Sequence, residues 1–144
     1  MSVYADTSLL VSYYVSDSNS NAAQAAIHGL SVPLIFTGLH RLEFKNAVSL
    51  GVYRTLLTPA KARSAWADVA QDLLAGRLLP CRVNWVPVFR IAAQLSLLHS
   101  STTGCRSLDV LHVAAARKLA ATEFWSFDLR QRTLAQTLGF VVKP

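Results

Sequence analysis

Four acidic side chains interrupt hydrophobic patterns in a chain that has only eight acids among its 144 residues. Glu43 and Asp109 each fall on the apolar stripe of a predicted helix, so their carboxylates are expected to point inward. Asp6 and Asp128 each follow a short apolar run of the kind that forms a buried strand. A carboxylate taken out of water is costly, so each of these four needs a cation, a hydrogen-bond network or a proton.

Each acid also has an ordinary structural explanation. An ion pair with Arg41, Arg106 or Arg117 could neutralise any one of them. Asp109 could stabilise the first turn of its helix, Asp128 could cap the last helix, and Asp6 could simply end a strand. These explanations do not account for all four in so acid-poor a chain, whereas a divalent ion does. Mg²⁺ or Mn²⁺ prefers hard oxygen ligands from a few carboxylates, water and phosphate.

The elements that must position these acids alternate between strand-like and helix-like patterns. We expect five strands, at Ser2–Ala5, Val32–Phe36, Leu78–Val83, Phe124–Phe127 and Phe140–Val142. We expect seven helices, at Thr7–Val15, Ala22–Gly29, Thr37–Tyr53, Pro59–Gly76, Val86–His99, Ser107–Ala121 and Leu129–Leu138, with Ser107 as a cap and Ser100–Gly104 as a loop. Such alternation predicts an α/β fold with a parallel sheet of four to five strands covered by helices on both faces. Ligands of such sheets bind beyond the carboxyl ends of the strands, where Asp6 and Asp128 fall.

Length and composition fit one domain spanning residues 1–144. Hydrophobic residues make up 52% and charged residues 15% of the chain, which favours an apolar surface for partners. A net charge of +6 is compatible with a polyanionic partner, and equally with simple solubility. The sequence has neither a run suited to a membrane span nor a signal-peptide layout, so we expect a cytoplasmic protein with no membrane partner. Cys81 and Cys105 lack zinc-site spacing and are expected to be free thiols.

Several stretches together resemble the PIN-domain family, and within it the VapC-type toxins of type II toxin–antitoxin systems. The resemblance covers nearly the whole chain and lies in Asp6-Thr7-Ser8-Leu9-Leu10, Arg41–Ala47, Arg106–Ala116, Ser126-Phe127-Asp128 and Leu138-Gly139-Phe140. It implies a doubly wound sheet in which Asp6, Glu43, Asp109 and Asp128 converge as an acidic metal site, with Ser8 and Ser126 as hydrogen-bonding support. Some members place a further acid or Asn soon after the last Asp, where this chain has Leu129-Arg130-Gln131, so a second ion is not implied.

The function implied by this resemblance is that of a Mg²⁺-dependent endoribonuclease, the toxin of a VapBC-type pair, with Mn²⁺ as a possible substitute ion. The ion would activate a water for attack on an RNA phosphodiester. Asp6 and Asp109 are expected to be the more direct ligands, with Glu43 and Asp128 completing the shell or orienting water. The implied partners are RNA, a cognate antitoxin and a second copy of the chain.

Basic residues near the matching stretches could hold RNA phosphates, namely Arg41, Lys45, Arg106, Arg130 and Arg132. They could equally form ordinary solvated helix faces. His40 is a candidate substrate contact, whereas His112 is expected to be a packed core histidine.

Two other classes of function compete with the nuclease. One is a non-catalytic PIN-like module that binds RNA or protein, in which the acids serve structure only. The other is a receiver-type phospho-acceptor domain, which also gathers Asp residues at strand ends. A receiver domain would need adjacent acids early in the chain and a Lys after a late strand, and neither is evident.

Overall fold

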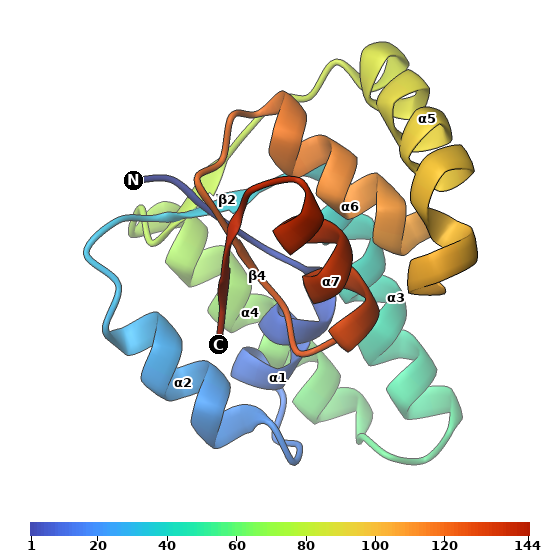
Figure 1. The fold of residues 1–144 in the computed structure, drawn as a ribbon. Helices are drawn as coiled ribbons and strands as arrows, with labels where there is room; N and C mark the ends of the chain where they lie inside the picture. Colours follow the sequence, from blue (N-terminus) through green and yellow to red (C-terminus); the bar gives the residue numbers. More distant parts are fainter.

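A computed structural model describes all residues, 1–144, as five strands and seven helices, with one or two helices between successive strands (Figure 1). The strands are β1 (Val3–Ala5), β2 (Leu34–Phe36), β3 (Leu78–Pro80), β4 (Glu123–Trp125) and β5 (Val141–Lys143). The helices are α1 (Thr7–Tyr14), α2 (Ser20–His28), α3 (Gly38–Tyr53), α4 (Pro59–Leu74), α5 (Trp85–Thr103), α6 (Ser107–Lys118) and α7 (Leu129–Thr137).

All five strands run parallel in one sheet with the order β3-β2-β1-β4-β5. The chain builds outward from β1 to β2 and β3, and then returns to place β4 on the other side of β1. The order of strands therefore reverses between β1 and β4, which is where open parallel sheets bind their ligands. The predicted α/β class with a parallel sheet is confirmed.

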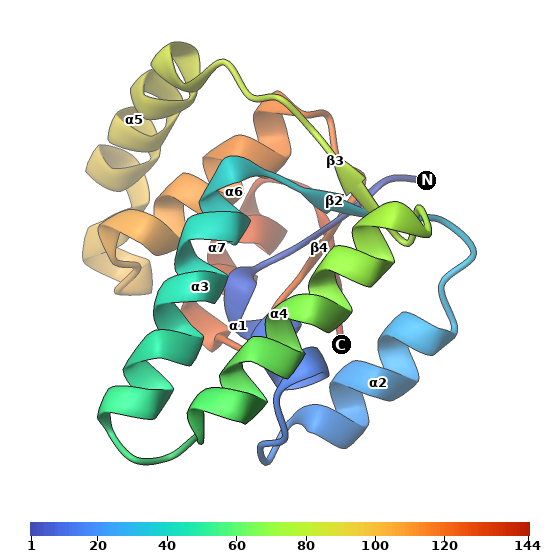
Figure 2. The ribbon, with the colours of Figure 1, turned by 180° about the vertical axis from the view of Figure 1, so that it is seen from behind.

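Helices cover both faces of the sheet because successive side chains of each strand point to opposite sides. Val3 and Ala5 of β1 pack with α1, α3 and α4, in a core that includes Leu9, Phe44 and Val69. Tyr4 points the other way into a second core, built by α5, α6 and α7. Figures 1 and 2 show α5 lying along α6, while α2 packs beside α1 on the opposite side of the molecule. No helix is both long enough and apolar enough to cross a membrane.

The boundaries of several elements differ from the sequence expectations. The predicted loop Ser100–Gly104 is wrong, because α5 continues to Thr103 and ends only at Gly104, whose φ of 70° is the left-handed conformation that suits glycine. Ser107 is the first residue of α6 and Arg106 is its cap. The third strand stops at Pro80, three residues earlier than expected.

Candidate functional site

The candidate site lies at the carboxyl ends of β1 and β4, the two strands between which the strand order reverses. Asp6 follows β1 directly, and its backbone N–H donates to the Trp125 carbonyl at the end of β4, at 2.9 Å. Ser126 and Asp128 follow β4. Strand pairing thus brings residues 120 positions apart to the same edge, as the pattern of strand-end acids predicted.

Three of the four candidate acids sit at helix N-termini. The carboxylate of Asp6 caps α1 by accepting from Leu9 N at 2.9 Å, and that of Asp128 caps α7 by accepting from Arg130 N at 2.8 Å. Asp109, in the first turn of α6, accepts from the backbone N–H of Arg106 at 2.9 Å. The N-terminal end of a helix carries partial positive charge, so each carboxylate gains local stabilisation. The capping roles considered for Asp109 and Asp128 are therefore present.

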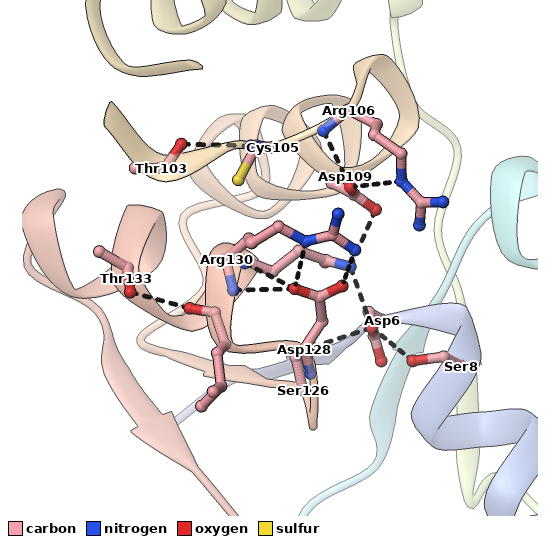
Figure 3. Close-up of polar contacts among 12 residues, drawn as sticks. Asp6, Ser8, Thr103, Cys105, Arg106, Asp109, Ser126, Asp128, Arg130 and Thr133 are labelled. Atoms are coloured by element: carbon pink, nitrogen blue, oxygen red, sulfur yellow. Dashed lines mark hydrogen bonds and ion pairs between the residues drawn. The ribbon is translucent and has the colours of Figure 1, made fainter. Parts of the chain in front are cut away.

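Asp6 is almost completely buried and is held by several donors. Its Oδ2 accepts from Ser8 Oγ at 2.7 Å, from Ser126 Oγ at 2.9 Å and from Gln131 Nε2 at 3.1 Å. Figure 3 shows Ser8 and Ser126 on either side of the Asp6 carboxylate. Burial raises the pKa of Asp6, and the hydrogen bonds from Ser8, Leu9 and Ser126 oppose that rise. Both serines contact this carboxylate, as the supporting role predicted for them requires.

Asp6 and Asp109 are brought together by a single amide. Gln131 Nε2 donates to Asp6 Oδ2 at 3.1 Å and to Asp109 Oδ1 at 3.2 Å. Both carboxylates are buried, with 1% and 6% of their surface exposed. Two buried carboxyl groups that share one donor bring their oxygens close together, and such oxygens are the ligands that hard cations prefer.

Two exposed arginines lie at the edge of the site formed by Asp6 and Asp109. Arg106 Nε donates to Asp109 Oδ2 at 3.2 Å, and Arg130 Nη2 donates to Asp128 Oδ2 at 2.7 Å (Figure 3). The hydrogen bond from Arg130 holds the pKa of Asp128 below its usual value. The Arg106 and Arg130 side chains remain 72% and 42% exposed, so they can reach a ligand while paired.

Glu43 is held through a separate network. Its Oε2 accepts from Thr7 Oγ1 at 2.8 Å and contacts His112 Nε2, while His112 Nδ1 lies 2.9 Å from the Tyr4 hydroxyl. Burial raises the pKa of Glu43, but the hydrogen bond from His112, the charge of His112 and the Thr7 hydroxyl outweigh burial and leave the pKa below its usual value. His112 is buried as predicted, and it also orients an acid of the candidate site.

The acids thus form one close pair, Asp6 and Asp109, while Asp128 and Glu43 each have a partner of their own. No group of three or more His, Cys, Asp or Glu side chains is arranged to hold a metal ion. The convergence of all four on one ion remains a prediction. Glu43 also lines a groove of about 480 Å³, together with Thr7, Ser8 and Leu108, so the network of Glu43 is open to ligands.

The other basic and histidine candidates are placed as follows. Arg41 and Lys45 lie over the ring of Trp66, at 5.4 and 4.3 Å from its centroid, on the surface formed by α3 and α4. The prediction that His40 contacts substrate is wrong, because its ring is fully buried and its Nε2 lies 2.8 Å from the Ala5 carbonyl oxygen. Arg132 Nη1 donates to the Ser126 carbonyl at 3.1 Å and contacts the Pro144 carbonyl, so it is held by the backbone.

The sequence reasoning did not find Gln131. A signal was available, because Gln131 shares a helical stripe with Leu134, Ala135 and Leu138, and so is a polar residue on an inward face. The same pattern predicts inward positions for Glu43 and Asp109, where the conflict between side chain and apolar stripe is stronger because a carboxylate costs more to bury than an amide.

Comparison with known proteins places this arrangement in a family. The family model of the PIN domain matches residues 3–136. No curated protein matches the chain by sequence. Among solved structures, FitAcB from Neisseria gonorrhoeae is similar, with 21% identity, a TM-score of 0.68, and coverage of 99% of this chain and 96% of the other.

Two further structures share the fold. Mycobacterium tuberculosis VapC20, described as a sarcin–ricin loop cleaving toxin, has 18% identity, a TM-score of 0.69 and coverage of 97% of both chains. VapBC2 from Rickettsia felis, bound to a DNA fragment from its promoter, has 12% identity, a TM-score of 0.61 and coverage of 99% and 97%. At these identities the likeness concerns the fold, whereas the family model covers most of the sequence itself. The chain therefore belongs to the PIN-domain family.

Proposed function

We propose that this protein is a divalent-metal-dependent endoribonuclease and the toxin of a toxin–antitoxin pair. The observation that carries the proposal is the pairing of Asp6 with Asp109, two buried carboxylates at the strand-order reversal that share one amide donor. Burying two carboxyl groups beside each other opposes folding through desolvation, and an arginine pairs with only one of them, so a purely structural role explains the arrangement poorly.

The residues present fit a hard divalent ion. Asp6 and Asp109 offer carboxylate oxygens, and the Oε1 oxygen of Gln131 is buried beside them without a hydrogen-bond partner. Oxygen donors of this kind are those that Mg²⁺ and Mn²⁺ prefer. We propose Asp6 and Asp109 as the holding pair, with Asp128 and Glu43 orienting water or completing the shell.

When bound, the ion would supply Lewis acidity that lowers the pKa of a water and offsets charge on the phosphate. The chain's own groups would do the rest. Arg106 and Arg130, exposed at the rim, would bind the phosphate oxygens next to the scissile bond. Glu43, kept ionised by His112 and Thr7, would orient or accept a proton from the attacking water. Ser8 and Ser126 would hold the Asp6 carboxylate in place.

Partners follow as part of the same proposal. The structural neighbours include a toxin and complexes with a partner chain or promoter DNA, so we propose control by a cognate antitoxin and action on RNA in the cytoplasm.

We also propose a homodimer. Leu97 and Leu98 on α5 and Leu74 at the end of α4 are strongly exposed apolar side chains available for such contacts. Light scattering after gel filtration would measure the oligomeric state.

The test is an RNA cleavage assay during Mn²⁺ or Mg²⁺ titration. Total bacterial RNA and a sarcin–ricin loop oligonucleotide serve as probes. We expect D6A and D109A to lose at least about 100-fold in rate, because even outer partners of metal ligands typically contribute 10–100-fold. D68A, which removes an exposed acid on α4, is the matched control and should cleave like the unmodified protein. Metal-dependent cleavage that survives both site substitutions would rule out the proposed site.

A second candidate is a PIN-like module that binds RNA or protein without cutting it. It is favoured by the ion pairs Arg106–Asp109 and Arg130–Asp128, which already neutralise two of the acids. Such a module would bind RNA in the same assay but leave it intact at every metal concentration.

A further inference from the structure

Gln131 has an unusual hydrogen-bonding pattern for a buried amide. It lies in α7 with 4% of its surface exposed, and its Nε2 donates to both Asp6 and Asp109. Its Oε1 accepts nothing, and this oxygen is the only buried side-chain nitrogen or oxygen of the chain without a hydrogen-bond partner. A buried amide that served structure alone would be expected to satisfy both ends, as nearly all buried polar groups do.

The direction of the amide is explained by the charges it faces. With no cation present, two buried carboxylates attract N–H donors and repel a carbonyl oxygen, so Nε2 must face them. The opposite holds when a divalent ion lies between the carboxylates. The N–H groups would then meet a positive charge, while an amide oxygen is one of the hard ligands that such ions accept.

The backbone around Gln131 gives the amide a fixed position from which to turn. Asp128 caps α7, and its Oδ1 accepts from the backbone N–H groups of Arg130 at 2.8 Å and of Gln131 at 3.4 Å. Gln131 is therefore in the first turn of a capped helix, opposite the carboxylates. A half-turn about its terminal side-chain bond exchanges the Nε2 and Oε1 positions and needs no movement of the helix.

We propose that Gln131 is a two-position residue of the metal site: its Nε2 holds Asp6 and Asp109 together in the metal-free protein, and its Oε1 turns toward the ion or a water on the ion when metal binds. This inference rests on the proposed metal-dependent function. It adds a neutral positioning residue to the acidic site and explains why one end of the amide is unsatisfied without metal.

Mn²⁺ affinity measured by calorimetry tests the role of Gln131 without reference to RNA cleavage. We expect Q131L to raise the dissociation constant about 10-fold or more, in the range that partners of metal ligands usually show. Q131E should lower the dissociation constant, because a carboxylate replaces the amide oxygen. It should also lower the melting temperature in EDTA, since three carboxylates then face one another. Q136L changes an exposed glutamine of the same helix and should match the unmodified protein.

A second readout uses the unmodified protein and needs no variant to fold. The side-chain ¹⁵N–¹H resonances of Gln131, assigned by their absence in Q131E, should shift on addition of diamagnetic Mg²⁺. Unchanged Mn²⁺ affinity in folded Q131L and Q131E, or Gln131 resonances that do not respond to Mg²⁺, would overturn the inference and leave the nuclease proposal standing. Failure of the unmodified protein to bind Mn²⁺ at all would overturn both.

Discussion

His40 and His112 lie side by side in the core, with ring centroids 5.2 Å apart, and both ring nitrogens of each have a polar partner. In His112, Nε2 contacts Glu43 Oε2, and Nδ1 lies 2.9 Å from the Tyr4 hydroxyl. In His40, a proton on Nε2 donates to the Ala5 carbonyl, while Nδ1 accepts from Thr37 N at 3.0 Å. A second proton on His40 would face the Thr37 N–H donor.

This arrangement predicts a loss of stability in mild acid. Burial, together with the charge of His112, lowers the pKa of His40 from 6.5 to about 3, against the opposing hydrogen bond to Ala5. The unfolded chain therefore binds a proton between these two pH values and the folded chain does not, so stability is complete above about pH 6.5 and falls as the pH drops. We expect His40 to cost about 2 kcal/mol at pH 5, at about 1.4 kcal/mol per pH unit.

Urea unfolding at pH 7.5 and pH 5 measures this loss, and H40N should show a smaller difference between the two pH values than the unmodified protein. H28N removes an exposed histidine and serves as the control. His40 ring signals in NMR provide a direct check. If they shift as though protonated at pH 5 in the folded protein, the explanation fails.

The inward placement of the candidate acids could be predicted from the sequence, because a carboxylate on an apolar stripe is out of keeping with its neighbours. That argument found Asp109 and Glu43, and strand ends found Asp6 and Asp128. It could not find the roles of His112 and Gln131. Those roles depend on contacts with Glu43, 69 positions away, and with Asp6, 125 positions away, which only the packed fold creates.

At the scale of elements, the site is formed where the N-termini of α1, α6 and α7 lie close together at the edge of the sheet. Asp128 serves both as cap of α7 and as partner of Arg130, and the two roles can be separated. We expect D128A to reduce the free energy of unfolding by about 1 kcal/mol, the usual cost of losing a cap. D128N should recover most of this, since asparagine is also a good cap, although it cannot form the ion pair.

Urea unfolding of both variants provides the measurement, and D68N on the exposed face of α4 is the control for removing a charge. Equal destabilisation in D128A and D128N would show that the ion pair with Arg130, and not the cap, stabilises α7.

Element types and order were predictable from periodicity, but some ends were not. The sequence Ser100-Ser101-Thr102-Thr103 has the composition of a loop, yet α5 continues through it. Thr102 Oγ1 and Thr103 Oγ1 donate to the His99 carbonyl at 3.0 and 2.9 Å, so these hydroxyls bond within the helix instead of ending it. Gly104 then ends the helix because it can adopt a positive φ. Composition alone cannot assign Ser and Thr residues to a helix or a loop, because their hydroxyls can form hydrogen bonds with the backbone in both.

At the scale of the whole molecule, the excess of fourteen basic over eight acidic residues favours polyanions, but only exposed cations near the site affect where they bind. Arg106 and Arg130 meet that condition. Arg41 and Lys45 are exposed too, but their charged groups lie over the Trp66 ring, and neither forms an ion pair with an acid of the site.

We therefore predict that the double variant R106A/R130A binds single-stranded RNA more weakly, with a shallower dependence on salt. Each lost phosphate contact should reduce the slope of log K against log salt by about 0.7. Fluorescence anisotropy of a labelled oligonucleotide in EDTA measures binding without cleavage. R63A/R90A removes two exposed arginines from α4 and α5 and gives the same net charge. An equal effect of the two double variants would mean that overall charge, and not position, governs RNA binding.

The centre of the site draws on both ends of the chain. Asp6 follows the first strand, whereas Asp109, Ser126 and Gln131 lie more than 100 positions further along the chain. During synthesis on the ribosome, Asp6 is made early together with its local partners Ser8 and Leu9, but long before its distant partners Ser126 and Gln131. The centre can therefore assemble only once the residues up to Gln131 have been synthesised, and a shorter nascent chain lacks it.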